Sequence, residues 1–422
     1  MKIIILGAGL IGVATAYYLW QDGHDVEVIE REPEPASVTS YANACLISAS
    51  RALPWPNPGS RGTLWRSLTD ANAPMKVTKW LDPTLWRWGR EFMSYANEAD
   101  FARLARAKLG FARFCQDELE ATLAATDVDC GYRRDGLLYV CRSDATLAAA
   151  RARVALVGAQ GYDVRLLSRD DAVTLEPALS GAGVVGATLA VSDAQGDSRC
   201  FTRALARWLA SRRERPVRFR FGETVTAKPL QRMRALELST GAGRLQADAY
   251  VAALGPHTAA FGRSLGRGVP IYPVKGFSLT VPVRDPAKAP TRGGICEDSL
   301  IAWCPLDSPD GPTMRITTGA VFCGDDNSYR DADFRAHREH FEALFPGALA
   351  WDHPSIERWA CQRPMTPSTL PIIQRDPTHA NLYWNCGQGH IGWTMSCGSA
   401  RVLADLIASR APSFDLADMQ RV

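Results

Sequence analysis

Three glycines and one acidic residue near the start of the chain have the types and the spacing needed to bind a dinucleotide. Glycine occupies the first, third and sixth positions of the segment Gly7-Ala8-Gly9-Leu10-Ile11-Gly12, and Glu30 follows 18 residues later. The first glycine permits a tight turn, the second lets the backbone approach a pyrophosphate, and the third lets a helix pack closely on a strand. The acid is placed to accept hydrogen bonds from the ribose hydroxyls of an adenosine.

The residues on either side of this motif predict the elements that would position it. Lys2–Leu6 is a short apolar run typical of a buried parallel strand, Val13–Gln21 is typical of a buried helix, and Val26–Glu30 predicts a second strand that ends on the acid. A pyrophosphate would then lie at the positive N-terminal end of the helix. The motif does not by itself distinguish FAD from NAD, and a strand–helix–strand unit without a ligand is the alternative.

The composition is that of a soluble globular protein long enough for two domains. The chain has 422 residues, of which 46% are hydrophobic and 22% are charged, and its net charge of +3 is too small to favour nucleic acid as a partner. Eleven cysteines without a Cys-x-x-Cys pair fit buried thiols in a reducing cytosol better than disulfides or a metal site. The first strand begins at residue 2 and no segment is apolar enough to span a bilayer, so we expect no secretory signal and a cytoplasmic location.

A segment of small, hydroxylated and uncharged residues follows the predicted strand–helix–strand unit. Ser37–Ala44 contains Ser40, Tyr41 and Asn43 within this pattern. Such residues let a chain pack against a planar ligand and donate hydrogen bonds to phosphate or ribityl oxygens. A loop that caps a helix would have the same composition, so this segment alone leaves both interpretations open.

Five motifs occur in an order that resembles a known enzyme family. They are Gly7–Gly12, Ser40–Ala44, Tyr272-Pro273-Val274-Lys275-Gly276, Arg363-Pro364-Met365-Thr366-Pro367 and Gly392–Gly398. On these motifs the chain resembles the FAD-dependent amine dehydrogenases and oxidases of the D-amino acid oxidase and glycine oxidase superfamily, and most of all the small-subunit type of D-amino acid dehydrogenase. The resemblance runs from the first strand to the last helix and implies FAD rather than NAD as the cofactor.

The resemblance implies an α/β fold in which a Rossmann-like FAD-binding domain is joined to a discontinuous α+β substrate-binding domain with an antiparallel or mixed sheet. We expect residues 1–50, 190–262 and 356–422 to form the FAD-binding domain, and residues 51–189 and 263–355 to form the substrate-binding domain. Similar proteins place the following residues against the cofactor: Gly7, Ala8, Gly9, Leu10, Ile11, Gly12, Glu30, Arg31, Ser40, Asn43, Ala44, Val225, Ala253, Leu254, Gly255, Gly389, Ile391, Gly392, Trp393 and Thr394.

Further elements are predicted from the hydrophobic spacing. Residues 91–125 have the spacing of a helix, and Asp248–Gly255 is expected to be the last strand of the dinucleotide domain, with small residues at its carboxyl end where ligands bind. Pro377–Ala400 is rich in glycine and asparagine, so we expect a loop and then a final helix from about Ser396. In the substrate domain we expect strands over 271–283, 299–304 and 313–321, followed by a helix over 331–345.

The reaction of the resembled family sets what the substrate site must do. An amino acid is oxidised when its Cα hydrogen passes as hydride to flavin N5, which leaves an iminium that water hydrolyses to a 2-oxo acid. The substrate carboxylate must be bound, and a planar guanidinium does so with two parallel hydrogen bonds. Arg363 occupies the position of the family's carboxylate-binding arginine. No dedicated acid or base is required if the bound amine is neutral.

Tyr272, Gln388 and His390 are the other candidates for the catalytic site. Tyr272 could donate a phenolic hydrogen bond, although a half-buried structural tyrosine fits the sequence nearly as well, and His390 is close to the cofactor by its position alone. Many relatives have Gly-His-Gly where this chain has Gly387-Gln388-Gly389, and Ser368-Thr369 replaces their usual Asp-Gly. The first exchange removes a titratable imidazole beside the flavin. The substrate therefore stays open between a D-amino acid and an imino acid such as a hydroxyproline.

Residues 51–90 combine tryptophan with basic side chains. Seven lysines and arginines in this segment are opposed by two aspartates, which suits a membrane–water interface. The alternative is that the tryptophans pack beneath the segment and the basic residues solvate its outer face. Relatives pass electrons to a membrane quinone, so we expect a quinone-type acceptor and a peripheral contact with the inner face of the cytoplasmic membrane. The tryptophans are Trp55, Trp65, Trp80, Trp86 and Trp88.

Two other functions remain open at this point. An amine oxidase of the glycine or sarcosine type would pass its electrons to dioxygen, and the formation of hydrogen peroxide under air would identify it. A flavin-binding sensor would hold the same cofactor without turning over any amine. The loss of turnover on substitution of Arg363, with the flavin still bound, would separate an enzyme from such a sensor.

Overall fold

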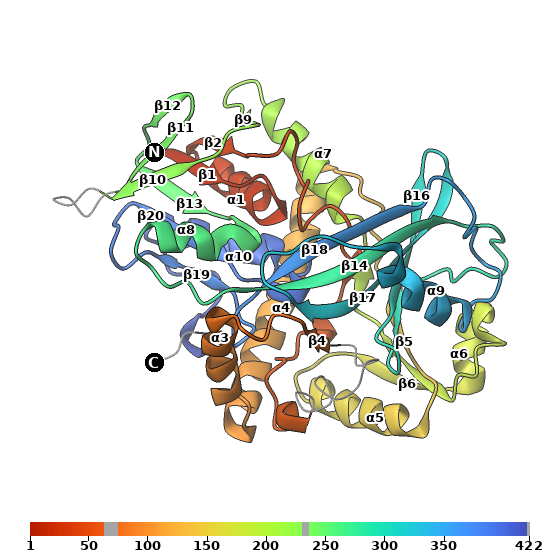
Figure 1. Ribbon diagram of the computed structural model, residues 1–422. Helices are drawn as coiled ribbons and strands as arrows, with labels where there is room; N and C mark the ends of the chain where they lie inside the picture. Colours follow the sequence, from red (N-terminus) through yellow and green to blue (C-terminus); the bar gives the residue numbers. More distant parts are fainter. Residues whose placement is uncertain (63–74, 230–235, 420–422) are drawn as a thin grey trace.

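The computed structural model describes residues 1–62, 75–229 and 236–419, and these contain two large β-sheets. Figure 1 shows the first sheet at the upper left, near the N-terminus, and the second sheet at the right. This arrangement confirms the expected α/β fold with a second sheet of mixed strand direction.

The first sheet is parallel except at one edge. β1 runs parallel to β2 and β13, β2 parallel to β9, and β13 parallel to β20, while β19 pairs antiparallel with β20. Ile3–Leu6 are all buried, because a parallel strand is covered on both faces and therefore needs no polar alternation. In the described residues its strand order is β19 (Ile372–Arg375), β20 (Leu382–Cys386), β13 (Ala249–Ala252), β1 (Lys2–Leu6), β2 (Asp25–Ile29) and β9 (Arg218–Arg220).

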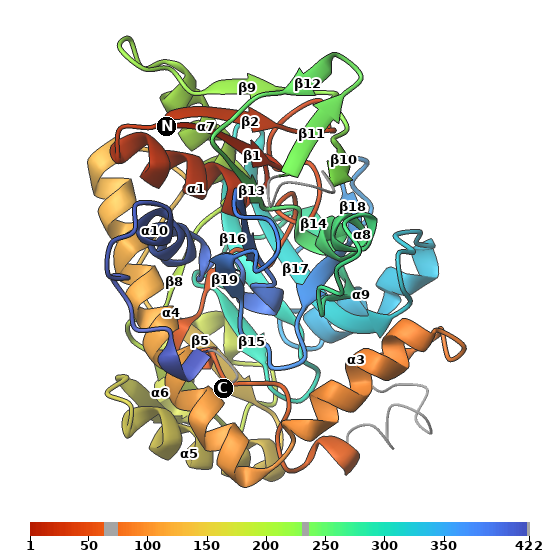
Figure 2. The same cartoon turned by 90° about the vertical axis from the view of Figure 1, so that its left-hand side faces the viewer.

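Helices cover one face of the first sheet and a small antiparallel meander covers the other (Figure 2). The helical face carries α1 (Leu10–Gln21), α4 (Glu98–Thr126), α7 (Ser198–Ala210) and α10 (Ser396–Ile407), which share one apolar core. The opposite face carries β10 (Thr226–Pro229), β11 (Leu236–Thr240), β12 (Gly243–Leu245) and α8 (Thr258–Ser264).

The second sheet is mostly antiparallel, with parallel pairs at β15–β5 and β17–β4. Alternate residues of β14, namely Phe277, Leu279 and Val281, face an apolar core that also holds Phe341. The opposite face of β14 is therefore free to line a site. Within the described residues its strand order is β18 (Glu357–Met365), β14 (Tyr272–Pro282), β17 (Gly311–Phe322), β16 (Ala302–Ser308), β15 (Gly294–Cys296), β5 (Leu137–Cys141), β7 (Gly186–Ala190) and β6 (Val164–Ser168), and β4 (Met75–Val77) also pairs with β17.

The remaining elements are short. β3 (Leu46–Ile47) pairs with β8 (Ala194–Gln195), and 3₁₀ turns connect several longer elements. The further helices are α3 (Pro83–Ser94), α5 (Asp144–Gly158), α6 (Arg169–Leu175) and α9 (Arg335–Glu342), and the 3₁₀ turns are η1 (Ala49–Arg51), η2 (Pro177–Leu179), η3 (Gly255–His257), η4 (Asp331–Phe334), η5 (Gly389–Ile391) and η6 (Ala417–Met419).

Two expectations for the first sheet were wrong. Asp248–Gly255 was expected to hold its last strand, yet β20 and β19 lie beyond β13, and β20 occupies part of Pro377–Ala400, which was expected to be a loop. All five residues of β20 are buried even though one of them is Asn385. The strand escaped prediction because the glycines that follow it dominate the composition of that stretch.

Two predicted helices are divided or shortened. The helical pattern over 91–125 is interrupted, because α3 ends at Ser94 and α4 begins at Glu98, where the Asn97 side chain accepts a hydrogen bond from the Asp100 N–H and caps the new helix. The helix expected over 331–345 is the turn η4 followed by the shorter α9. The strands predicted over 271–283 and 313–321 are present as β14 and β17.

Two elements cross the predicted domain boundaries. β18 lies in the range 356–422 assigned to the FAD-binding domain, but it pairs along its whole length with β14 of the second sheet. The helix α4 lies in the range 51–189 assigned to the substrate-binding domain, but it packs against α10 beside the first sheet. β18 therefore belongs to the second sheet, and α4 packs with the first.

Candidate active site

A cavity of about 550 Å³ is lined by residues from both large sheets and from the loops at the carboxyl ends of β1, β2 and β13. This is the edge of a parallel sheet at which α/β folds bind their ligands. Most of the predicted site residues line it, namely Gly7, Gly9, Leu10, Ile11, Glu30, Arg31, Ser40, Asn43, Ala44, Val225, Ala253, Leu254, Gly255, Arg363, Gln388, Gly389, His390, Gly392 and Trp393.

The glycine turn has the geometry that its spacing predicts. Gly7 has a φ of 102°, which side chains rarely allow, and a Cβ placed on Gly12 would lie 1.9 Å from the Gly7 carbonyl oxygen. The Glu30 carboxylate accepts a hydrogen bond of 2.7 Å from the Ala8 N–H, so the acid supports the turn directly. Gly12 and Ala8 thus contribute to the conformation of the turn but do not line the cavity.

The N-terminus of α1 offers an electropositive end to the cavity. Its cap is Gly9, its first turn contains no acidic residue, and Ser40 Oγ accepts from the Leu10 N–H at 3.0 Å. A bare glycine backbone at a helix N-terminus fits the pyrophosphate of a dinucleotide. The residues present therefore fit the cofactor that the motif predicts, and Gly9, Leu10 and Ile11 line the cavity where they would hold its diphosphate.

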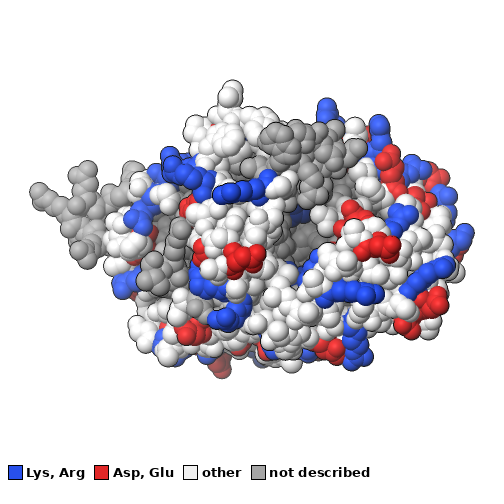
Figure 3. Space-filling view, turned by 90° about the horizontal axis from the view of Figure 1, so that it is seen from below, with Lys and Arg blue, Asp and Glu red and all other residues white. Residues whose placement is uncertain are grey.

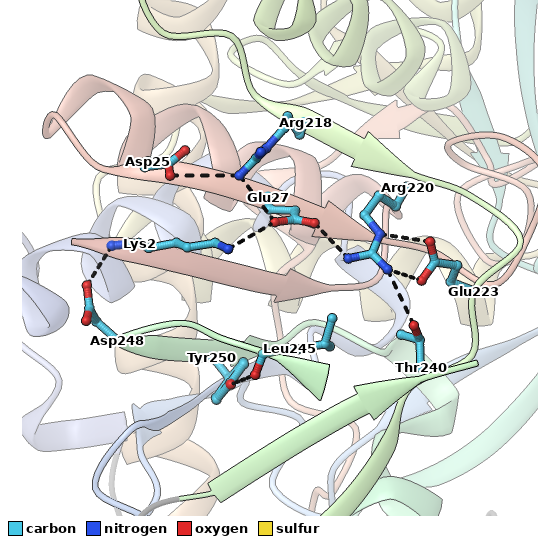
Figure 4. A network of polar contacts seen from close by, with 10 residues as sticks. All are labelled: Lys2, Asp25, Glu27, Arg218, Arg220, Glu223, Thr240, Leu245, Asp248 and Tyr250. Atoms are coloured by element: carbon cyan, nitrogen blue, oxygen red, sulfur yellow. Dashed lines mark hydrogen bonds and ion pairs between the residues drawn. The ribbon is translucent and has the colours of Figure 1, made fainter. Parts of the chain in front are cut away.

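A network of ion pairs lies beside the part of the cavity that Glu223 and Val225 line (Figure 4). Glu27 of β2 is buried and pairs with Arg220 at 2.9 Å and with Arg218 at 3.5 Å. Arg220 also pairs with Glu223, which lines the cavity beside Val225. The network therefore ties β2 and β9 to the segment around Val225, which the resemblance places against the cofactor.

Arg363 lies on β18, on the wall of the cavity that the second sheet provides. Its Nη1 donates a hydrogen bond of 2.7 Å to the Gly319 carbonyl oxygen, and burial lowers the pKa of its guanidinium below the ordinary value. Within the described parts of the chain, no aspartate or glutamate forms an ion pair with it. A buried guanidinium in this state favours an anionic ligand, because the ligand's charge would offset the loss of hydration.

Gln388 and His390 lie in the turn between β20 and α10 and both line the cavity. Gln388 Nε2 donates to Asn385 Oδ1 at 2.7 Å, so its amide is held within the protein. The His390 ring contacts the Trp55 ring at an interplanar angle of 33°, with ring centroids 4.9 Å apart, and its Nδ1 is buried without a hydrogen-bond partner. Burial and the nearby positive charges lower the pKa of His390 well below the ordinary value, so its ring is neutral at pH 7.

Five predicted residues do not line the cavity: Ala8, Gly12, Tyr272, Ile391 and Thr394. The Tyr272 hydroxyl donates to Asp82 Oδ2 at 3.0 Å and faces a second cavity, so its predicted hydrogen bond to substrate does not fit its position. Thr394 Oγ1 instead accepts from the Ser48 N–H, and Ile391 packs in the core of the first sheet. Lys275 also points away and pairs with Asp326.

The sequence reasoning missed several residues of the cavity wall. Cys361 and Trp359 lie two and four residues before Arg363 on β18, and Ser278 pairs with Trp359 across the ladder. Counting back from Arg363 in steps of two would have found Cys361 and Trp359, since alternate residues of a strand share a face. Ser278 and His257 had no such signal, because their places depend on pairing between distant segments.

Comparison with known proteins identifies the class of the chain. Residues 2–406 match the family model described as FAD dependent oxidoreductase, and the chain belongs to this family. FAD is therefore its cofactor, and the protein is an oxidoreductase.

Individual relatives are similar over the full length. D-amino acid dehydrogenase 2 of Mesorhizobium japonicum is 37% identical over 417 residues, covering 98% of each chain, and D-amino acid dehydrogenase of Granulibacter bethesdensis is 35% identical over 422 residues, covering 99% of this chain and 98% of its own. Among solved structures, glycine oxidase from Geobacillus kaustophilus has a TM-score of 0.72 at 19% identity, covering 99% and 97% of the two chains. L-proline dehydrogenase from P. horikoshii has a TM-score of 0.71 at 15% identity, covering 97% and 93%. These two likenesses show the fold.

The tryptophans of residues 51–90 divide into two groups. Trp88 is buried and Trp55 contacts the His390 ring, whereas Trp80 and Trp86 are 37% and 55% exposed. Trp65 lies outside the described residues. Leu81, between the two exposed tryptophans, is 95% exposed.

Figure 3 shows the molecule from below, where lysine and arginine side chains alternate with acidic ones in small groups. The helices of the described chain include none long and apolar enough to cross a membrane.

Proposed function

We propose that the protein removes a hydride from the Cα of a D-amino acid, or of a secondary amine such as a hydroxyproline, and transfers it to FAD. The product is the corresponding iminium, which water hydrolyses to the 2-oxo acid and ammonia or an amine. The observation that carries this proposal is the place of Arg363. Its guanidinium has no carboxylate partner among the described residues and lies on the wall of the cavity that holds the glycine turn. A carboxylate bound there would bring the neighbouring Cα into the cofactor cavity.

Bound FAD would supply the acceptor for the hydride, and the chain would supply orientation. Arg363 would hold the substrate carboxylate with two charge-assisted hydrogen bonds. His390 is neutral at pH 7, so it would add no positive charge against the amine and could accept a proton from it only weakly. The amine would therefore enter in its neutral form, and we expect turnover to rise with pH toward the pKa of the bound amine.

The preference for D-substrates rests on the relatives at 35–37% identity, whose names are D-amino acid dehydrogenase. The test is an anaerobic spectrum of the purified protein mixed in turn with D- and L-amino acids, glycine, sarcosine and proline derivatives. Loss of flavin absorbance near ~450 nm with the D-series or with a hydroxyproline supports the proposal. A flavoprotein that none of these compounds reduces would contradict it and favour a flavin-binding sensor.

We also propose that a quinone accepts the electrons, with a glycine- or sarcosine-type oxidase as the alternative. The reduced enzyme should be reoxidised at least ~100-fold faster by a soluble ubiquinone analogue than by air-saturated buffer. Production of one hydrogen peroxide per amine oxidised, at the full rate of turnover, would instead make the protein an oxidase.

A membrane contact would suit a quinone acceptor, and the exposed side chains of Trp80, Leu81 and Trp86 are the surface that favours it. Aromatic and aliphatic side chains insert at the bilayer interface, while the lysines and arginines around them attract anionic lipid. The double variant Leu81→Glu, Trp86→Glu should lose co-sedimentation with anionic vesicles and keep wild-type turnover with a soluble dye. Wild-type protein that stays out of the vesicle pellet at both low and high salt would contradict the contact.

A further inference from the structure

The side chain of Arg363 crosses a neighbouring strand before it reaches its hydrogen-bond partner. In the second sheet β14 lies between β18, which carries Arg363, and β17, which carries Gly319. The guanidinium nevertheless donates to the Gly319 carbonyl oxygen at 2.7 Å. It must therefore lie across β14, on the face of the sheet that lines the cavity.

The residue of β14 beneath the guanidinium is Gly276. It pairs with Cys361 on β18, two residues from Arg363 and on the same face of the sheet. A Cβ placed on Gly276 would lie 2.5 Å from Arg363 Nη2, 2.6 Å from its Cζ and 2.7 Å from its Nη1. Three contacts this short leave no room for a methyl group, so the guanidinium occupies the space that the absent side chain provides.

The partner carbonyl is presented by an irregularity in β17. The register of β14 and β17 shifts between Lys275, which pairs with Val321, and Phe277, which pairs with Thr318. Three steps along β17 thus oppose two along β14, which is the pattern of a β-bulge. Gly319 lies in this bulge with a φ of 87°. The bulge frees its carbonyl from the regular ladder and leaves it available to the Nη1 of Arg363.

We propose that Gly276 is a positioning residue for carboxylate recognition, and that it acts by seating the Arg363 guanidinium flat across β14 against the bulged carbonyl of Gly319. This inference rests on the proposed role of Arg363. One edge of the guanidinium is held by the protein, so the donors on its other atoms stay oriented for the substrate carboxylate. The Val-Lys-Gly part of the motif around residue 275 thereby has a function, since Gly276 seats the arginine and Lys275 anchors the strand through Asp326.

The test compares Gly276→Ala, Arg363→Lys and the double variant in the flavin-loaded enzyme. Displacing the guanidinium should raise the KM for the substrate by about 10- to 100-fold and change the limiting rate of flavin reduction by less than about threefold. Calorimetric affinity for propionate, a carboxylate without an amine, should fall by the same factor as KM rises. Gly158→Ala in α5 is the matched control, because a Cβ there meets no atom within 4 Å.

The double variant shows whether the alanine acts through the arginine. A lysine has no planar guanidinium to collide with the new methyl group, so Gly276→Ala should change KM by less than about twofold in the Arg363→Lys background. A wild-type KM and propionate affinity in Gly276→Ala would overturn the proposal, and so would an undiminished effect in the Lys background. If Gly276→Ala is purified without flavin, the double variant should bind flavin again. A double variant that also lacks flavin would overturn the proposed positioning of Arg363 by Gly276. A wild-type KM in Arg363→Lys alone would instead contradict the proposed function.

Discussion

The glycine turn of the first sheet and the arginine site of the second sheet depend on the sequence in different ways. The turn and the acid that supports it fall between Gly7 and Glu30, so one strand–helix–strand unit brings them together. Arg363 bonds to a residue 44 positions away and does so across a third segment of the chain. The glycine turn is thus formed by residues close together in the sequence, whereas the proposed substrate site depends on the register of distant strands.

The largest effect should follow from filling the space behind the turn. In Gly12→Ala the new Cβ would lie 1.9 Å from the Gly7 carbonyl oxygen. This contact is with a backbone atom, so no flexible side chain can move to relieve it. We expect protein purified without flavin and a free energy of unfolding lowered by about 3 kcal/mol. Flavin absorbance per protein and urea unfolding measure the two effects. Wild-type flavin content in this variant would show that the close packing of α1 on β1 is not what forms the site.

A second glycine of the same turn should separate binding from folding. Gly9 has a φ of −70°, and a Cβ there would lie 3.6 Å from Ser40 Oγ, which is an ordinary contact. The methyl group of Gly9→Ala would instead enter the cavity where the pyrophosphate approaches the backbone. We expect about 100-fold weaker FAD binding, with the unfolding free energy of the apoprotein unchanged within about 0.5 kcal/mol. Fluorescence titration with FAD is the measurement, and unchanged affinity would place the pyrophosphate elsewhere.

Lys108 of α4 is a buried cation that donates hydrogen bonds to the Leu53 carbonyl oxygen and to Thr369 Oγ1. Burial lowers its pKa to about 7, whereas an unfolded chain holds this proton to about pH 10. Between these values the unfolded chain binds more protons, so the stability of the wild type rises with pH. Lys108→Met should therefore raise the unfolding free energy by about 2 kcal/mol at pH 6 and by less at pH 9.5.

Urea unfolding at the two pH values measures this effect. The exposed Lys288→Met is the control, because its ammonium is hydrated in the folded state and its removal should not change the pH dependence. A Lys108→Met variant that is equally destabilised at pH 6 and at pH 9.5 would show that its two hydrogen bonds outweigh the burial of its charge.

The smallest expected effect concerns the acid at the end of β2. In Glu30→Gln one amide oxygen remains to accept from the Ala8 N–H, while the negative charge that would bind the ribose hydroxyls is lost. We expect about fivefold weaker FAD binding, equivalent to about 1 kcal/mol, with little change in the kcat of the saturated enzyme. Equilibrium dialysis with FAD measures the difference. A loss as large as that of Gly9→Ala would make Glu30 a support of the turn more than a ribose ligand.

The parts of the fold that local spacing determines could be predicted. Lys2–Leu6, the following helix and the glycine turn follow from apolar runs and from glycines whose conformation or close contacts exclude side chains. The strands β5, β14 and β17 also follow from their β-branched and aromatic content. The break at Asn97 was missed, because a helix cap and a polar helical residue have the same composition until the backbone is known.

The parts of the fold and of the site that depend on pairing between distant segments could not be predicted from the sequence. Tyr272 belongs to a family motif, but its hydroxyl faces Asp82 from a segment almost 200 positions earlier, and no local pattern contains that contact. The place of Gly276 beneath the Arg363 guanidinium depends on the register of β14 with β18 and on the bulge in β17. A second reason why β20 was missed, besides the glycines that follow it, is that its buried Asn385 is satisfied by Gln388 and Thr15, partners that only the folded chain supplies.

The central claim is that the second sheet selects a carboxylate, through Arg363, for oxidation at a flavin held by the first sheet. The most direct test is the anaerobic rate of flavin reduction by D-alanine and by ethylamine, which lacks only the carboxylate, in the wild type and in Arg363→Ala. The wild type should prefer D-alanine by about 10³-fold or more in kcat/KM, and the variant should lose most of this preference while keeping its flavin. An Arg363→Ala enzyme that still prefers D-alanine to the same degree would contradict the account.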